Sequence, residues 1–103
     1  MIRVALHGEN GRCTGFDCRG HALFAPYGKD IVCAAVSVLA TTCVNALESV
    51  AGIRPQVHLE AGEMTVLVPP DAGHDAQVIL SALRQGLRDI AEQYPQHLQL
   101  IEN

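Results

Sequence analysis

The chain opens with apolar and polar residues in alternation, the pattern of a strand with one buried face. Residues 1–8 alternate in this way, and Asn10-Gly11 follows as a hairpin signal, since type I′ turns need positive φ at both central residues. A returning strand is predicted over residues 13–22. Its alternation places His21 on the face opposite to Phe16.

A long apolar helix is predicted over residues 31–50. Pro26 and Gly28 mark the segment 23–29 before it as a loop. Asp30 is a candidate N-cap, because its side chain can accept hydrogen bonds from the first free N–H groups of the helix. Apolar residues occur nearly all round this helix, so we expect it to be buried on two sides, by the sheet and by a partner subunit.

The second half of the chain repeats this order. Two strands, a second helix and a short edge strand are predicted over residues 56–60, 64–68, 72 or 73 to 93, and 97–101. Two hairpins that are each followed by a helix predict an α+β fold. We expect one domain over residues 1–103, with a two-layer ββαββα arrangement, a mainly antiparallel sheet and both helices on one face.

Charge and composition narrow the classes of function. The net charge is −4 and the basic residues form no cluster, which argues against direct binding of nucleic acid and suits a basic partner. The start of the chain lacks the apolar core of a secretory signal. The longest charge-free stretch, residues 31–47, is too short and too mildly apolar to span a bilayer comfortably. We therefore expect a cytoplasmic protein that makes no contact with a membrane.

In that compartment the four cysteines are expected to be reduced thiols. No C-x-x-C pair occurs and the histidines share no ligand spacing, so we expect neither a metal nor a cofactor. Cys13, Cys18 and Cys43 are interpreted as small buried or half-buried hydrophobic residues.

Cys33 is the strongest candidate for chemistry, because it would lie in the first turn of the helix that Asp30 caps. Unpaired N–H groups and the positive end of the helix dipole favour a thiolate there, and the same groups could hold the oxyanion of an acyl-transfer intermediate. His21 is a candidate base, and Gly20 beside it leaves room for another backbone or a substrate. Ser37 lies one turn after Cys33 and could orient a substrate or the histidine. From these residues alone, an inert buried thiol and an ordinary strand-end histidine remain open.

A family resemblance bears on these alternatives. Gly20-His21-Ala22, followed by the run Tyr-Gly-Lys-Asp-Ile-Val-Cys-Ala-Ala-Val-Ser over residues 27–37, resembles the signature of the ribosomal-processing cysteine protease (Prp) family. Length and element order are also similar, so the resemblance covers essentially the whole chain. One departure is Leu23, where many members have glycine, and it leaves the mobility of the following loop open.

The resemblance implies roles for individual residues. Cys33 falls on the catalytic cysteine of the family and His21 on its catalytic histidine, and Asp30 and Ser37 fall on the supporting aspartate and serine. The family loop that covers the site falls on residues 23–29 here. Gly20, Tyr27 and Gly28 are the expected substrate-binding residues.

The resemblance also implies an activity. Family members remove a short N-terminal extension from large-ribosomal-subunit protein twenty-seven, and they form homodimers. We therefore expect a homodimeric cysteine endopeptidase that acts on this precursor during ribosome assembly. The alternative is a noncatalytic ribosome-associated binding protein in which Cys33 and His21 serve packing.

Overall fold

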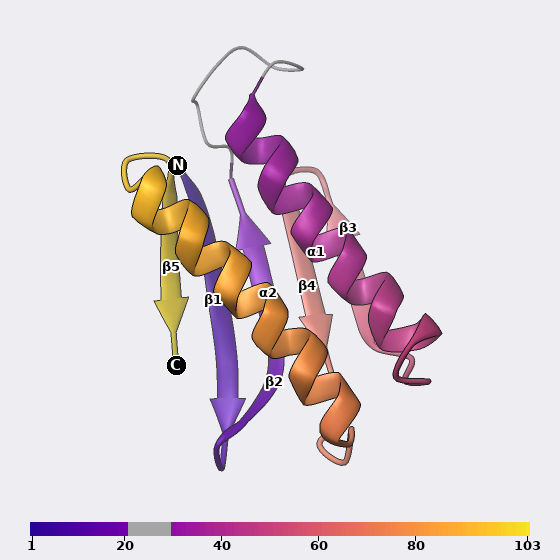
Figure 1. Ribbon diagram of the computed structural model, residues 1–103. Helices are drawn as coiled ribbons and strands as arrows, with labels where there is room; N and C mark the ends of the chain where they lie inside the picture. Colours follow the sequence, from indigo (N-terminus) through magenta and orange to yellow (C-terminus); the bar gives the residue numbers. More distant parts are fainter. Residues whose placement is uncertain (21–29) are drawn as a thin grey trace.

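The structure is a computed structural model, and it describes residues 1–20 and 30–103. The elements follow in the order predicted from the sequence, with bounds close to the predicted ones (Figure 1). They are β1 (Ile2–Glu9), β2 (Arg12–Arg19), α1 (Ile31–Ser49), β3 (Gln56–Glu60), β4 (Glu63–Leu67), α2 (His74–Gln93) and β5 (Leu98–Glu102).

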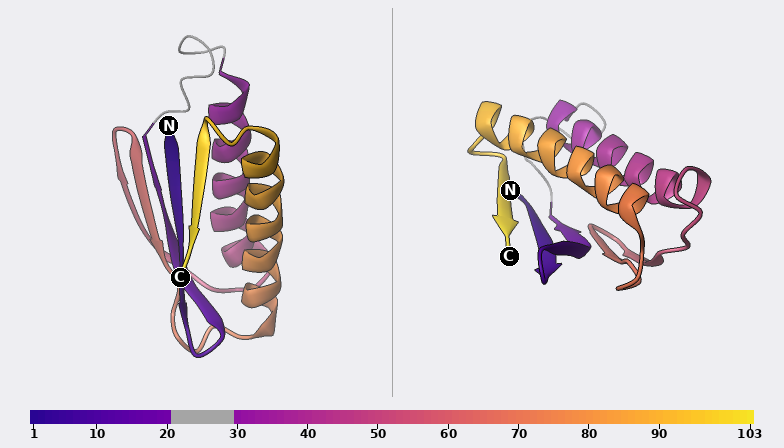
Figure 2. Two further views of the ribbon diagram at one scale, coloured as in Figure 1. Left: turned by 90° about the vertical axis from the view of Figure 1, so that its left-hand side faces the viewer. Right: turned by 60° about the horizontal axis from the view of Figure 1, so that its bottom comes forward.

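The five strands form one sheet in the order β3-β4-β2-β1-β5. The pairs β1–β2, β2–β4 and β3–β4 are antiparallel, whereas β5 lies parallel to β1 at the far edge. Both helices cover the same face, so the described residues form two layers, and no described helix covers the other face of the sheet (Figure 2). The predicted α+β fold, with a mainly antiparallel sheet and two helices on one face, is confirmed.

The core lies between the sheet and the helices and is almost entirely aliphatic. Among the described residues, Phe16 is the one fully buried aromatic side chain, and it packs among leucines and valines from both layers. The largest fully buried side chains are Phe16, Leu47, Leu80, Leu87, Leu98, Val4, Val32 and Val66. The first turn is the predicted one, since Asn10 and Gly11 have φ of 54° and 78°.

β2 is shorter than predicted, and Gly20 explains why. The strand ends at Arg19, and Gly20 follows with a φ of 86°, a left-handed conformation that interrupts the extended backbone. A Cβ at this position would lie 2.6 Å from the carbonyl oxygen of Met1, so only glycine fits without a shift. The close approach predicted for Gly20 is therefore to the backbone of Met1. His21, on which the predicted strand also fell, lies outside the described residues.

α1 is buried along one side of the chain's own fold. Its buried stripe is Val32, Val36, Ala40, Cys43 and Leu47. Ile31 and Val38 expose 55% and 64% of their surface, so the expected second covered side is open within one chain. By length and composition, α1 is also the one helix of the described ranges that could cross a membrane, a test that core helices of soluble proteins pass as well.

Candidate functional site

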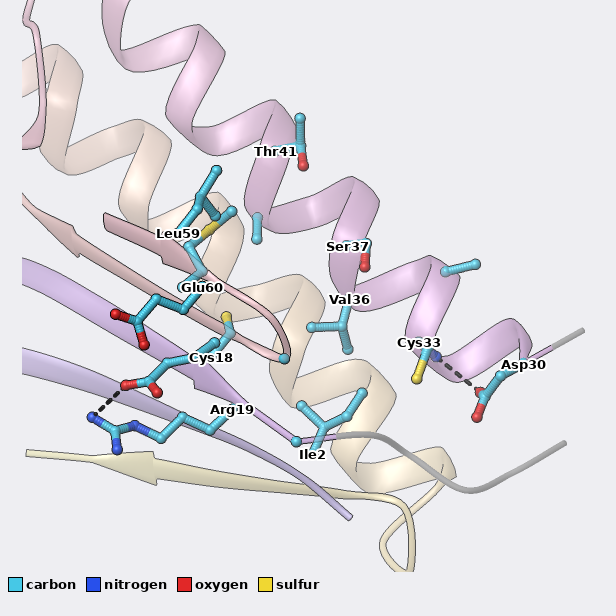
Figure 3. A pocket seen from close by; sticks show the side chains of 16 residues that line it. Ile2, Cys18, Arg19, Asp30, Cys33, Val36, Ser37, Thr41, Leu59 and Glu60 are labelled. Carbon is cyan, nitrogen blue, oxygen red and sulfur yellow. Dashed lines mark hydrogen bonds and ion pairs between the residues drawn. The ribbon is translucent and has the colours of Figure 1, made fainter. Parts of the chain in front are cut away.

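A cleft of about 800 Å³ opens between α1 and the β3–β4 hairpin, beside the ends of β1 and β2 (Figure 3). Helix residues form one wall and hairpin residues form the other, and the floor is apolar. The lining residues are Ile2, Cys18, Arg19, Gly20, Asp30, Cys33, Ala34, Val36, Ser37, Ala40, Thr41, Leu59, Glu60, Gly62, Glu63 and Met64. Cys33, Asp30, Ser37 and Gly20 were singled out from the sequence, and the structure brings all four to this cleft.

Asp30 fixes the start of the helix that carries Cys33. Its Oδ1 accepts hydrogen bonds from the backbone N–H groups of Val32 at 3.0 Å and Cys33 at 2.9 Å, and its backbone is extended. The Asp30 carbonyl oxygen accepts a further bond from the N–H of Ala34 at 3.0 Å. The predicted N-cap is confirmed. Cys33 is half-buried directly after this cap and faces the cleft (Figure 3).

The cap corrects one prediction about the oxyanion. The first-turn N–H groups were expected to be available for a developing negative charge, but those of Val32, Cys33 and Ala34 already donate to Asp30. The negative charge of the Asp30 carboxylate also lies at the start of α1, where it offsets the positive end of the helix dipole. While the cap is closed, the N–H groups of Val32, Cys33 and Ala34 are therefore not available to an oxyanion.

Hydroxyl groups continue along the same wall of the cleft. Ser37 and Thr41 follow Cys33 at intervals of one helical turn, and both are exposed (Figure 3). The sequence analysis found Ser37 but missed Thr41. The spacing of four residues along α1 is the signal that predicts its position.

The facing wall comes from the β3–β4 hairpin, which begins more than twenty residues after Cys33 in the chain. It contributes Leu59, Glu60, Glu63 and Met64, and none of these was predicted. Glu63 pairs with Arg19 of β2 at 3.1 Å, which ties the hairpin turn to the neighbouring strand. No local motif marks these residues, because only the pairing of β2 with β4 brings them to Cys33.

The other cysteines differ from Cys33 in their surroundings. Burial, and secondarily the charge of Asp17, raises the pKa of Cys18 to about 11. Burial, and secondarily the nearby Cys13 and Cys18, raises the pKa of Cys43 to about 12. All four cysteines are free thiols, and Cys13 and Cys43 are buried. The interpretation of these three as core-like residues is confirmed.

The remaining predicted residues have no described position. His21, Tyr27 and Gly28 lie outside the described residues. Two histidines that the structure does describe pair with carboxylates: His7 pairs with Asp17 at 2.7 Å, and His58 pairs with Glu60 at 2.9 Å. Across residues 1–20 and 30–103, no group of three or more His, Cys, Asp or Glu side chains is arranged to hold a metal ion.

Comparison with known proteins shows to which family the chain with this cleft belongs. Residues 1–99 match the family model described as "Cysteine protease Prp". The chain belongs to the cysteine protease Prp family. The family and the enzyme class expected from the sequence are thus confirmed.

Relatives in the Prp family match along their whole length. The chain is 32% identical over 110 residues to the ribosomal processing cysteine protease Prp of Bacillus subtilis strain 168, covering 100% of this chain and 98% of that protein. It is 30% identical over 103 residues to that of Staphylococcus aureus strain Mu50, covering 97% of each.

Solved Prp structures share the fold closely. A crystal structure of S. aureus Prp with a covalently linked product peptide superposes with a TM-score of 0.94 at 29% identity, over 100% of both chains. The same enzyme in complex with a substrate peptide gives a TM-score of 0.88 at 28% identity, again over 100% of both chains.

Proposed function

We propose that this protease removes the N-terminal extension of large-ribosomal-subunit protein twenty-seven in the cytoplasm and so supports ribosome assembly. The observation that carries the proposal is the position of Cys33, half-buried behind an aspartate cap at one wall of a cleft. The names of the relatives assign them to ribosomal processing, and S. aureus Prp has been crystallised with substrate and product peptides.

The proposed reaction is acyl transfer through a cysteine nucleophile. His21 takes the proton of the Cys33 thiol or holds its thiolate as an ion pair, and the sulfur attacks the scissile carbonyl carbon. Collapse of the tetrahedral intermediate expels the amine, which receives the proton from His21. Water then hydrolyses the thioester. Because the Asp30 carboxylate occupies the helix start, His21 rather than the helix dipole supplies the main activation of the thiol.

Ser37 is the proposed donor to the oxyanion. Its hydroxyl lies one turn from Cys33 on the cleft wall, and a hydroxyl rotates to donate where charge develops. The backbone N–H groups of Val32 and Cys33 already donate hydrogen bonds to Asp30. Ser37→Ala should therefore lower kcat more than it raises KM, whereas Ser37→Thr should retain much of the activity.

We also propose a homodimer that covers the open side of α1. A shallow apolar surface there is formed by Ile31, Ala34, Ala35, Val38, Leu39, Gly86 and Ile90. A Cβ at Gly86 would lie 2.8 Å from a methyl carbon of Leu39, so glycine lets the two helices approach and keeps this surface shallow. Sedimentation should give a dimer at micromolar concentration and a monomer for Val38→Glu. A wild-type monomer under these conditions would contradict the proposal.

Two measurements test the activity. The purified enzyme should cleave the extended ribosomal protein of its own organism at one site, as read by intact mass. Iodoacetamide at pH 6 should alkylate Cys33 faster than Cys18 and Cys43, whose raised pKa values keep them protonated. Failure to cleave, together with equal alkylation of all the cysteines, would favour a noncatalytic binding protein.

A further inference from the structure

Leu59 is an apolar side chain that is left uncovered at the wall of the cleft. It belongs to the edge strand β3 and exposes 64% of its surface. Among the exposed large hydrophobic residues of the described ranges, Leu59 alone lines this cleft. Single exposed leucines are common on protein surfaces, so its exposure alone decides nothing. Leu59 matters because it forms part of the wall of the cleft that Cys33 also lines, toward the end near Thr41 (Figure 3).

The residues around Leu59 extend its apolar surface into the cleft. Met64 is its direct cross-strand partner in β4, so the two side chains lie next to each other on the helix-covered side of the sheet. Val36 and Ala40 of α1 form the apolar floor and are themselves part of the core. Leu59 and Met64 therefore form one apolar wall opposite the helix. Glu60, which Figure 3 labels beside Leu59, lies at the nearby hairpin turn.

We infer that Leu59 and Met64 form a specificity subsite, which takes one apolar side chain of the peptide substrate where it runs along the cleft from Cys33 toward Thr41. The inference rests on the proposed function and adds to it the residues that select the substrate. The occupant is the substrate rather than a second copy, because this apolar wall is continuous with the cleft that Cys33 faces. A volume of about 800 Å³ lies within the range of ligand sites and holds several side chains.

Val57 provides a matched control for Leu59. It lies two residues earlier in the same edge strand, so its side chain points to the same side of the sheet. It exposes 40% of its surface but does not line the cleft. Val57→Ala and Leu59→Ala thus remove methyl groups from the same exposed strand, and only Leu59→Ala changes the proposed subsite.

The first measurement is binding without catalysis. The probe is a fluorescein-labelled peptide spanning the junction between the extension and the mature part of the ribosomal protein, bound to the Cys33→Ala variant and followed by anisotropy. Adding Leu59→Ala should raise Kd about tenfold, the low end for lost methylene contacts because the subsite is open on one side. Adding Val57→Ala should leave Kd unchanged, and Leu59→Met should restore it. Thermal unfolding of each variant checks that the fold is retained.

The second measurement identifies the substrate position. Each residue of the probe is replaced by alanine in turn, and Kd is compared between the Leu59 and Leu59→Ala proteins. One apolar position should lose its effect when Leu59 is absent, as coupled partners in a double-mutant cycle do. Equal Kd values for Leu59→Ala and Val57→Ala would overturn the subsite, and so would a probe that does not bind the Cys33→Ala variant. If binding depends on Leu59 but the wild-type enzyme leaves the probe uncut, the proposed protease activity fails and the binding site stands.

Discussion

α1 and α2 both follow a β-hairpin and both lay one apolar stripe on the same face of the sheet, but they begin differently. The Asp30 side chain caps α1, whereas α2 begins after Gly73 with no side-chain cap. α2 carries its charges on the outside, where Arg84 and Arg88 pair with Glu102 of β5 at 3.3 and 2.7 Å. The ion pairs of α2 attach it to the edge strand β5, whereas the cap of α1 fixes the position of Cys33.

The strongest test of this contrast compares two cysteines within α1. Cys33→Ala should lower cleavage by about 10⁴-fold or more, because it removes the nucleophile, and should leave the fold intact. Cys43→Ala should retain cleavage but lower the free energy of unfolding by about 1 kcal/mol, since Cys43 is buried in the core. Intact mass reads the cleavage and thermal unfolding reads the stability. A clean Cys33→Ala preparation that still cuts the precursor would eliminate the mechanism.

Loss of the proposed base, His21, should have the second-largest effect on activity. His21→Ala should lower kcat by about 10² to 10⁴-fold, the usual contribution of general acid–base catalysis. In the Cys33→Ala background, the same change should leave peptide affinity nearly unaltered. Steady-state kinetics and anisotropy separate the two quantities. Near-normal turnover by His21→Ala would remove the histidine from the mechanism.

Loss of the cap should have a moderate effect. Asp30→Ala removes the acceptor for the N–H groups of Val32 and Cys33 and should cost about 1 kcal/mol of stability, with a parallel loss of activity as the first turn loosens. Asp30→Asn keeps a capping oxygen and should keep the stability. If Asp30→Asn is stable but inactive, the charge of Asp30 takes part in the chemistry in addition to its role as a cap.

The smallest effect is expected at the other helix. Gly73→Asp should give α2 the side-chain cap that it lacks and raise stability by a few tenths of a kcal/mol. Gly73 has a φ of −66° and open space where a Cβ would lie, so the residue fits. Cleavage should not change. A rise in thermal unfolding temperature with constant kcat/KM would show that the two helix starts serve separate purposes.

The fold could be predicted largely from local pattern, because each element carries its own periodicity and its own end signals. Asn10-Gly11 predicted the first turn and Asp30 predicted the start of α1. The early end of β2 was missed because it depends on the approach of Met1 to Gly20, a contact between distant parts of the chain. The two walls of the cleft also differ in how far they could be predicted from local sequence. Its helix wall follows from the sequence next to Cys33, whereas Leu59 and Met64 reach the site only through strand pairing.

The parallel pairing of β5 with β1 bears on when this enzyme can act. Ile2 is a lining residue of the cleft, and it is held by pairing with Leu98 and by a hydrogen bond from its N–H to the carbonyl oxygen of His97 at 3.0 Å. Contacts between residues so far apart in sequence form only after the whole intervening chain is available. During translation, Cys33 is made 65 residues before Leu98, so the cleft around it is completed only when residue 98 has left the ribosome. The order of synthesis therefore delays completion of this cleft until residues 97 and 98 have been made.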